Sequence, residues 1–162
     1  MSIKKSLMVI GLTALGSFHA VPAISSDSQQ ADLAKGKYLV QLGGCNDCHT
    51  AGYAPSGAQT PVQNWLLGDS LGYKGPWGTT YPTNLRQFIQ NFSEAQWIAY
   101  AQTMKTRPPM PWWVLNAMTT DDLAAIYKFI KSLGPSVATV PSYVAPGQPT
   151  KAPYIQWPEP PK

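Results

Sequence analysis

The pattern of apolar and polar positions predicts three helices. The first lies within residues 31–42, where apolar side chains recur every three or four positions. Ser93-Glu94-Ala95-Gln96 has the form of a capping box and predicts a second helix that ends near Thr103. The last begins at Thr120-Asp121-Asp122, with acidic residues in its first turn as the helix dipole favours, and ends before Gly134-Pro135. We expect the apolar faces of these helices to form the core.

The rest of the chain lacks such periodicity. Residues 51–83 are rich in Gly, Pro, Ser and Thr, and predict a long loop with a short helical turn near Trp65. A loop of this length in a compact domain is usually functional. Residues 135–162 contain eight prolines, which exclude a regular helix, so this segment is either an extended arm packed on the domain or a mobile tail. We favour the packed arm because aromatic residues such as Tyr143 and Trp157 can dock.

The N-terminal residues have the composition of an export signal. Lys4 and Lys5 precede a mostly apolar run from Leu7 to Phe18, and small residues follow at Val21-Pro22-Ala23. Residues 1–23 are therefore predicted to be a signal peptide. The apolar run is shorter than the roughly 20 residues of a membrane-spanning helix, and no later stretch comes closer. We expect an exported periplasmic protein without a membrane span after cleavage; an uncleaved N-terminal anchor is the alternative.

Length and charge restrict the organisation further. With 162 residues, the chain has room for one compact domain. The predicted division is a signal peptide at 1–23, a helical domain at 24–134 and a Pro-rich extended C-terminal arm at 135–162. Loss of Lys4 and Lys5 with the signal leaves ten basic and eight acidic residues, a net charge of +2. This charge is too small to indicate a nucleic-acid partner.

One motif carries recognisable chemistry. Cys45-Asn46-Asp47-Cys48-His49 matches C-x-x-C-H, the attachment signature of c-type haem. Two cysteines at this spacing reach the two vinyl groups on one edge of a porphyrin, and His49 then lies beneath the iron. Neutral imidazole is a good iron ligand, and its other nitrogen needs an acceptor, for which the carbonyls of Pro55, Pro61 and Pro76 are candidates. The predicted cofactor is one covalent haem c per chain.

Three other interpretations of the cysteine pair are open. A thioredoxin-like redox pair belongs near a strand-helix-strand pattern, which is not found around residues 38–60. Structural zinc needs two further ligands, but the chain has no third cysteine, and its other histidine, His19, lies in the predicted signal. A plain disulfide fits an oxidising compartment, although closing so short a loop strains the bond.

The second axial ligand is predicted by elimination. After signal cleavage His49 is the only histidine, which rules out bis-histidine ligation within the chain. A methionine thioether is a soft ligand that suits haem iron and raises its reduction potential. Met110 lies in Arg107-Pro-Pro-Met-Pro-Trp112, where prolines fix the backbone. We therefore predict that His49 and Met110 ligate the iron, and we assign Met104 and Met118 to packing.

This arrangement resembles the class I cytochromes c, in which an N-terminal helix leads into C-x-x-C-H, a methionine loop follows, and a C-terminal helix crosses the first. The resemblance covers about residues 31–134. It rests on Gly36 and Tyr38 before the haem motif, on Met110, and on the helix from Leu123 to Leu133. It implies an all-α, cytochrome c-like domain around one covalently bound haem, with long loops and the Pro-rich arm in addition.

Residues 75–85 are also similar to the stretch before the helices in cytochrome c domains that serve periplasmic dehydrogenases. The resemblance implies an electron carrier rather than an enzyme, acting alone or as a haem subunit. Its donor would be a dehydrogenase for an alcohol, sugar or aldehyde, and its acceptor a terminal oxidase or another cytochrome. The single haem and the Pro-rich tail depart from those subunits. The alternative is a small-molecule sensor or haem enzyme with an open sixth site, where Arg86, Arg107 or tyrosines would be the distal donors.

Overall fold

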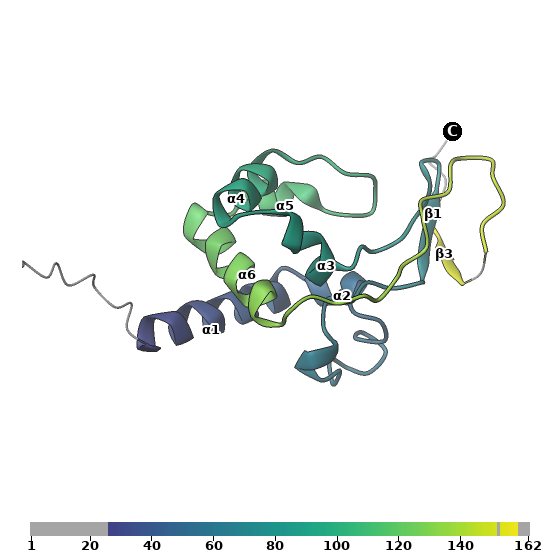
Figure 1. Ribbon diagram of the computed structural model, residues 1–162. Coiled ribbons are helices and arrows are strands. Elements are labelled where there is room, and N and C mark those ends of the chain that lie inside the picture. The colour runs from purple at the N-terminus through teal and green to yellow at the C-terminus, as the bar shows by residue number, and fades with distance from the viewer. Residues whose placement is uncertain (1–25, 152, 159–162) are drawn as a thin grey trace, which may run out of the picture.

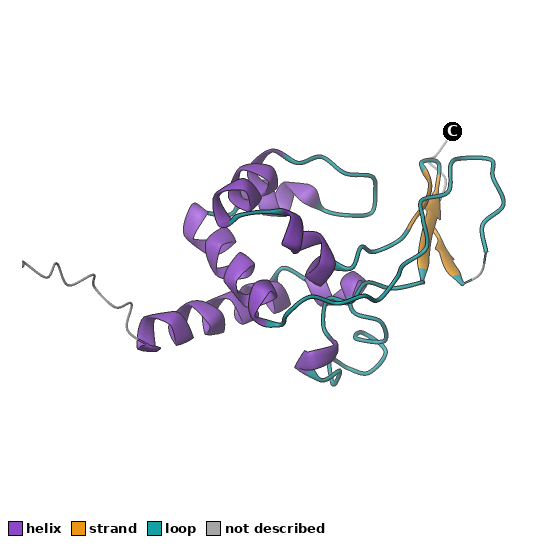
Figure 2. Cartoon of the chain, viewed as in Figure 1, coloured by secondary structure: helices purple, strands orange, loops and turns teal. Residues whose placement is uncertain are grey.

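The computed structural model describes residues 26–151 and 153–158, so the predicted signal peptide at 1–23 lies outside the described residues. Helices gather in one part of the molecule and strands in another (Figure 1, Figure 2). The helices are α1 (Ser26–Leu42), α2 (Cys45–His49), α3 (Leu85–Phe88), α4 (Glu94–Thr103), α5 (Trp112–Ala117) and α6 (Thr120–Ser132), with 3-10 turns η1 (Val62–Asn64) and η2 (Ile89–Asn91). In the part of the chain that the structure describes, no helix combines the length and the apolar character needed to cross a bilayer.

Helices α1 and α6 approach each other closely at Gly36. A Cβ atom at this position would collide with the carbonyl oxygen of Ala125 and lie 2.6 Å from the Cβ of Phe129. Exposed ion pairs join the same two helices, between Lys35 and Asp122 at 2.8 Å and between Lys128 and Asp32 at 2.7 Å. Ion pairs of this kind contribute little to stability. The packing of α1 on α6 therefore depends mainly on the close backbone approach at Gly36.

The core lies between α1, α4 and α6. Val40, Leu123 and Ile126 are almost fully buried there. Trp97 of α4 joins them, and its indole Nε1 donates a hydrogen bond to the Leu123 carbonyl at 3.0 Å. This bond satisfies the one polar atom of a large buried ring, so the indole adds apolar contact without an unpaired donor.

The helix ends follow their sequence signals. The predicted capping box at α4 is confirmed, because the Ser93 hydroxyl accepts from the Gln96 amide at 3.3 Å and the Gln96 side chain accepts from the Ser93 amide at 2.9 Å. Helix α6 starts at Thr120 as predicted. The residue that caps it is Thr119, whose hydroxyl accepts from the Asp122 amide at 3.2 Å.

The interpretation of residues 51–83 as loop is wrong in its last third. Strands β1 (Gly72–Gly75) and β2 (Gly78–Thr80) form an antiparallel hairpin, and β3 (Tyr154–Gln156) pairs parallel to β1, giving the order β2-β1-β3. The predicted all-α class is therefore too narrow. Strands of three or four residues that contain glycine show no alternation long enough to detect. The predicted helical turn near Trp65 is present as η1.

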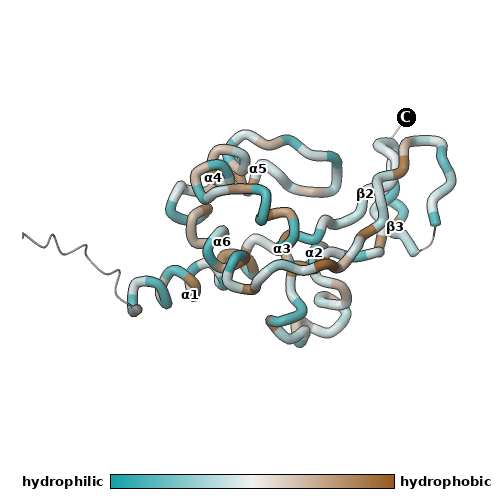
Figure 3. Tube along the Cα trace, viewed as in Figure 1, coloured by the Kyte–Doolittle hydropathy of each residue, from teal (hydrophilic) through white to brown (hydrophobic). Residues whose placement is uncertain are grey.

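Residues 135–151 run from the helices to the strands, and Figure 3 marks apolar stretches along this path. Near its start, the Asn84 side-chain amide donates to the carbonyls of Ser136 at 3.2 Å and Ala138 at 2.9 Å. Further on, Val144 exchanges two backbone hydrogen bonds with Thr79, at 2.8 and 3.0 Å. These bonds hold the segment to the α3 end of the helical part and to the hairpin.

Substitution of Gly36 tests the α1–α6 packing. We expect Gly36→Ala to lower the free energy of unfolding of the protein by about 1–3 kcal/mol, because the new methyl group overpacks a backbone contact. Gln29→Ala, on an exposed turn of the same helix, should change it by less than about 0.5 kcal/mol. Chemical denaturation measures both. A Gly36→Ala protein as stable as the parent would mean that the helices do not meet at this residue.

Candidate functional site

A cavity of about 420 Å³ lies between the helices, the hairpin and the arm. This volume falls within the roughly 300–1,000 Å³ of small-molecule and cofactor sites. Apolar side chains of α4, α5 and α6, among them Trp97, Leu115 and Ile126, line one side of it. The predicted site residues Cys45, Cys48, His49 and Met110 all line the same cavity.

A single helical turn, α2, presents the motif to this cavity. Gly44 precedes it with φ of +66°, a left-handed conformation that glycine adopts at little cost, and this turn separates α2 from α1. Cys45, Cys48 and His49 then all face the cavity, with the two thiols partly buried and not joined in a disulfide. The plain disulfide interpretation therefore finds no support in this geometry.

The cysteine environment also disfavours a thioredoxin-like pair. Burial raises the pKa of the Cys45 thiol to about 11, opposed only in part by a backbone hydrogen bond. A redox-active pair needs a lowered thiol pKa, since the thiolate is the reacting species. Cys48 receives a hydrogen bond from the Tyr73 hydroxyl at 3.4 Å, so the hairpin reaches the second thiol.

The His49 ring is oriented by one backbone contact. Its Nδ1 lies 2.7 Å from the carbonyl oxygen of Thr83, which accepts the ring proton. Burial lowers the pKa of His49 and outweighs the opposing effect of this hydrogen bond, so the imidazole is neutral at pH 7. With the proton on Nδ1, the lone pair of Nε2 is available for a metal.

The sequence leaves the acceptor of that proton open, with the carbonyls of Pro55, Pro61 and Pro76 as candidates. The structure places none of these there; the acceptor is the carbonyl of Thr83. Thr83 is 34 positions from His49, directly after the hairpin. Its neighbour Asn84 caps α3 by accepting from the Gln87 amide at 3.0 Å and is bonded to the arm, which fixes the carbonyl of Thr83 between two elements.

All three described methionines line the cavity, so position alone does not select the ligand. The Met110 segment is tied to β2, because the Thr80 hydroxyl donates to the Pro108 carbonyl at 2.8 Å, and it is closed by a local turn in which the Trp112 amide donates to the Met110 carbonyl at 2.9 Å. A Cβ atom at Gly43 would lie 3.6 Å from the Met118 methyl group and 3.7 Å from the Cys45 sulfur, so both groups flank Gly43. This arrangement favours Met110 as the fixed thioether.

The two arginines considered as distal donors differ in position. Arg86 donates to the backbone carbonyls of Gly134 at 2.8 Å and Gln63 at 2.9 Å, and also to that of Leu133, so it ties chain segments together away from the cavity. Arg107 lines the cavity, and its guanidinium lies 3.8 Å from the centre of the Tyr143 ring. Tyr73 and Tyr143 line it as well; the sequence indicates tyrosines only as a class of distal donor and singles out neither of these two.

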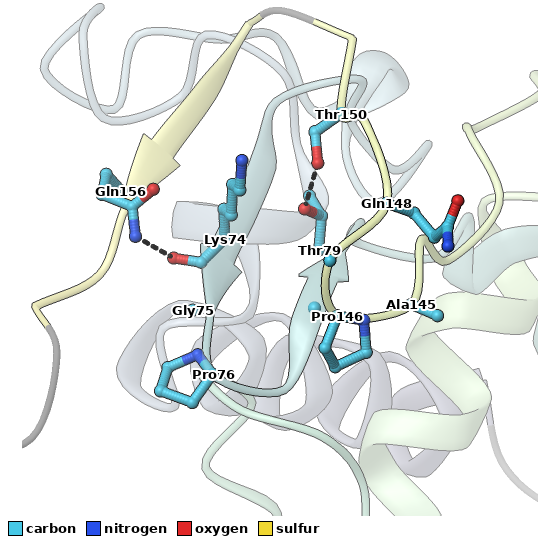
Figure 4. A pocket seen from close by; sticks show the side chains of 11 residues that line it. Lys74, Gly75, Pro76, Thr79, Ala145, Pro146, Gln148, Thr150 and Gln156 are labelled. Atoms are coloured by element: carbon cyan, nitrogen blue, oxygen red, sulfur yellow. Dashed lines mark hydrogen bonds between the residues drawn. The ribbon is translucent and has the colours of Figure 1, made fainter.

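A second cavity of about 270 Å³ lies between β1, β2 and the arm (Figure 4). Its polar groups are bonded to one another: the hydroxyls of Thr79 and Thr150 are 2.7 Å apart, and the Gln156 amide donates to the Lys74 carbonyl at 3.4 Å. No cysteine, histidine or methionine of the described chain lines it. The chemistry of the motif is therefore confined to the larger cavity.

The donor set of the larger cavity fits a covalently attached haem. Two thiols, a neutral imidazole with a free nitrogen and three thioethers line an otherwise mainly apolar space. Among the described residues, no three His, Cys, Asp or Glu side chains gather where they could hold a metal ion directly. The side chains thus suit a flat apolar group that brings its own metal better than a structural zinc ion.

Comparison with known proteins gives a concordant result. A family described as Cytochrome c matches residues 33–134. The cytochrome c subunit of alcohol dehydrogenase (quinone) from Gluconacetobacter polyoxogenes is 31% identical over 146 residues, which are 84% of this chain and 27% of that subunit. The corresponding subunit from Komagataeibacter europaeus gives the same values.

The subunit of the same name from Gluconobacter oxydans (strain 621H) is 29% identical over 164 residues, covering 95% of this chain and 30% of the relative. The chain therefore spans less than a third of the length of these curated relatives. No solved structure matches it.

Proposed function

Because the chain belongs to the cytochrome c family, we propose that it is a periplasmic electron carrier with a single haem ligated by His49 and Met110. Family membership implies a covalently bound haem c, and Cys45 and Cys48 are the residues that would hold it. When bound, the haem supplies an iron that accepts and releases single electrons. The observation that carries the proposal is that the two thiols, the imidazole and the thioether line one mainly apolar cavity.

The protein's part in electron transfer is to keep the ligand side chains still. The Thr83 carbonyl holds the His49 ring through Nδ1, which also makes Nε2 a stronger donor. Bonds at Pro108 and at the Met110 carbonyl hold the methionine segment. Rigid ligands move little when the iron changes charge, and this keeps the reorganisation energy of electron transfer small.

The walls of the cavity favour a positive reduction potential. Trp97, Ile126 and Ile130 present apolar surface, in which the extra positive charge of oxidised iron is poorly solvated. A thioether ligand acts in the same direction. Both effects stabilise the reduced form, as an acceptor of electrons from a dehydrogenase requires.

The relatives suggest the class of donor. They are named as cytochrome c subunits of quinone alcohol dehydrogenases, and the chain matches about a quarter to a third of their length. We take a dehydrogenase for an alcohol or a similar substrate as the donor, and a terminal oxidase or another cytochrome as the acceptor. The predicted signal at residues 1–23 supports the periplasmic location.

Methionine variants test the ligation. Met110→Leu should abolish the weak far-red band of methionine-ligated ferric haem, lower the midpoint potential and let carbon monoxide bind the reduced protein, because leucine cannot ligate. Met104→Leu and Met118→Leu are matched controls and should keep the band, since both residues line the same cavity and the proposal assigns them to packing. Loss of the band in either control would move the ligand to that residue. A parent protein without the band that binds carbon monoxide would favour the open-site sensor.

Stopped-flow spectroscopy tests the electron-carrier function. The oxidised holoprotein is mixed with a purified quinone-dependent alcohol dehydrogenase that lacks its own cytochrome subunit, together with the alcohol. We expect haem reduction whose rate rises in proportion to the dehydrogenase concentration. An NAD-dependent alcohol dehydrogenase with the same alcohol is the control and should give none. Failure of the quinone enzyme to reduce a haem that dithionite reduces fully would argue against this donor class.

A further inference from the structure

The lining of the larger cavity is chemically asymmetric. Helices α4, α5 and α6 contribute mainly apolar side chains, whereas the polar ones come from the hairpin, the loop before α5 and the arm. Arg107 is the only lysine or arginine among the described residues that line the cavity, and no aspartate or glutamate lines it. The cavity therefore has one fixed positive charge and no fixed negative charge of its own.

Arg107 is oriented but has no anionic partner in the described chain. Its guanidinium stacks on the ring of Tyr143 at 3.8 Å, and the Tyr143 hydroxyl donates to the Trp77 carbonyl at 2.8 Å. Stacking uses the flat face of the guanidinium and leaves its N–H edges free. Within the described residues, neither ion pair involves Arg107, and it forms no side-chain hydrogen bond.

Haem carries two carboxylates on the edge opposite the vinyl groups. A haem attached through Cys45 and Cys48 in an apolar cavity needs a partner for those carboxylates, since a buried charge without one is costly. The planar fork of arginine matches a carboxylate with two parallel hydrogen bonds. Lys105, two residues before Arg107, does not line the cavity; its ammonium lies 5.9 Å from the centre of the Trp112 ring.

We propose that Arg107, held by stacking on Tyr143 of the C-terminal arm, binds the carboxylates of the attached haem. The inference rests on the proposed function, because it places a haem in this cavity. Tyr143 lies beyond residues 33–134, which the cytochrome c family matches, so the arm adds a positioning residue from outside the matched segment.

The arginine should raise the reduction potential. Reduction lowers the positive charge of the iron, and a fixed cation near the haem that neutralises its carboxylates favours the less positive form. Without the cation, the negative carboxylates stabilise oxidised iron. The equilibrium constant for reduction should then fall.

The test compares Arg107→Gln with Lys105→Gln in the haem-loaded protein. Both remove one positive charge from the same exposed loop, but only Arg107 lines the cavity. Arg107→Gln should lower the equilibrium constant for one-electron reduction by about threefold to tenfold, where tenfold corresponds to 59 mV. It should also shift the propionate-bending band in the resonance Raman spectrum. Lys105→Gln should change neither.

Tyrosine variants test the positioning role. Tyr143→Leu removes the stacking ring and should shift the propionate band in the same direction as Arg107→Gln, by a smaller amount. Tyr143→Phe keeps the ring and should leave the band at its parental position. Tyr143 is 40% exposed, so neither substitution leaves a cavity in the hydrophobic core.

Equal midpoints for Arg107→Gln and Lys105→Gln, or an unmoved propionate band, would overturn the assignment. The far-red band separates this failure from failure of the proposed function. If the parent protein shows that band and Arg107→Gln behaves like the lysine control, only the arginine assignment is wrong. If the parent lacks haem or the band, the proposed function itself is at fault.

Discussion

The hydrogen bond between His49 Nδ1 and the Thr83 carbonyl is the contact on which the site depends. It sets which imidazole nitrogen is free and how the ring is turned toward the cavity. Thr83 lies between the hairpin and α3, and Asn84 ties this point to the arm. A second bond, from the Gly68 amide to the His49 carbonyl at 2.8 Å, holds the backbone of the motif. Segments far apart in sequence thus hold the ring and the backbone of His49.

The site contains few charged groups. Burial keeps His49 neutral and the Cys45 thiol protonated, so the reactive groups of the apoprotein carry little charge. The helices supply apolar walls, and Arg107 is the one lysine or arginine among the described residues that line the cavity.

Features encoded locally were predictable from the sequence. The motif at Cys45–His49, the capping box at Ser93 and the helix from Thr120 depend on neighbouring residues, and the structure and family match agree with them. The acceptor at Thr83 and the stacking of Arg107 on Tyr143 depend on tertiary contacts across 34 and 36 positions, which no local pattern encodes. The strands were missed because each has only three or four residues, and because β1 and β2 include glycine. Ligation by Met110 stays a prediction. So does the division of the chain into a signal peptide (1–23), a helical domain (24–134) and a C-terminal arm (135–162).

The central claim is that the iron of the attached haem is held by one histidine and one methionine of this chain. X-ray absorption at the iron K-edge of the oxidised holoprotein measures its nearest neighbours directly. The account predicts a sulfur neighbour in addition to the nitrogens of the porphyrin and of His49. An iron surrounded only by nitrogen and oxygen would contradict it.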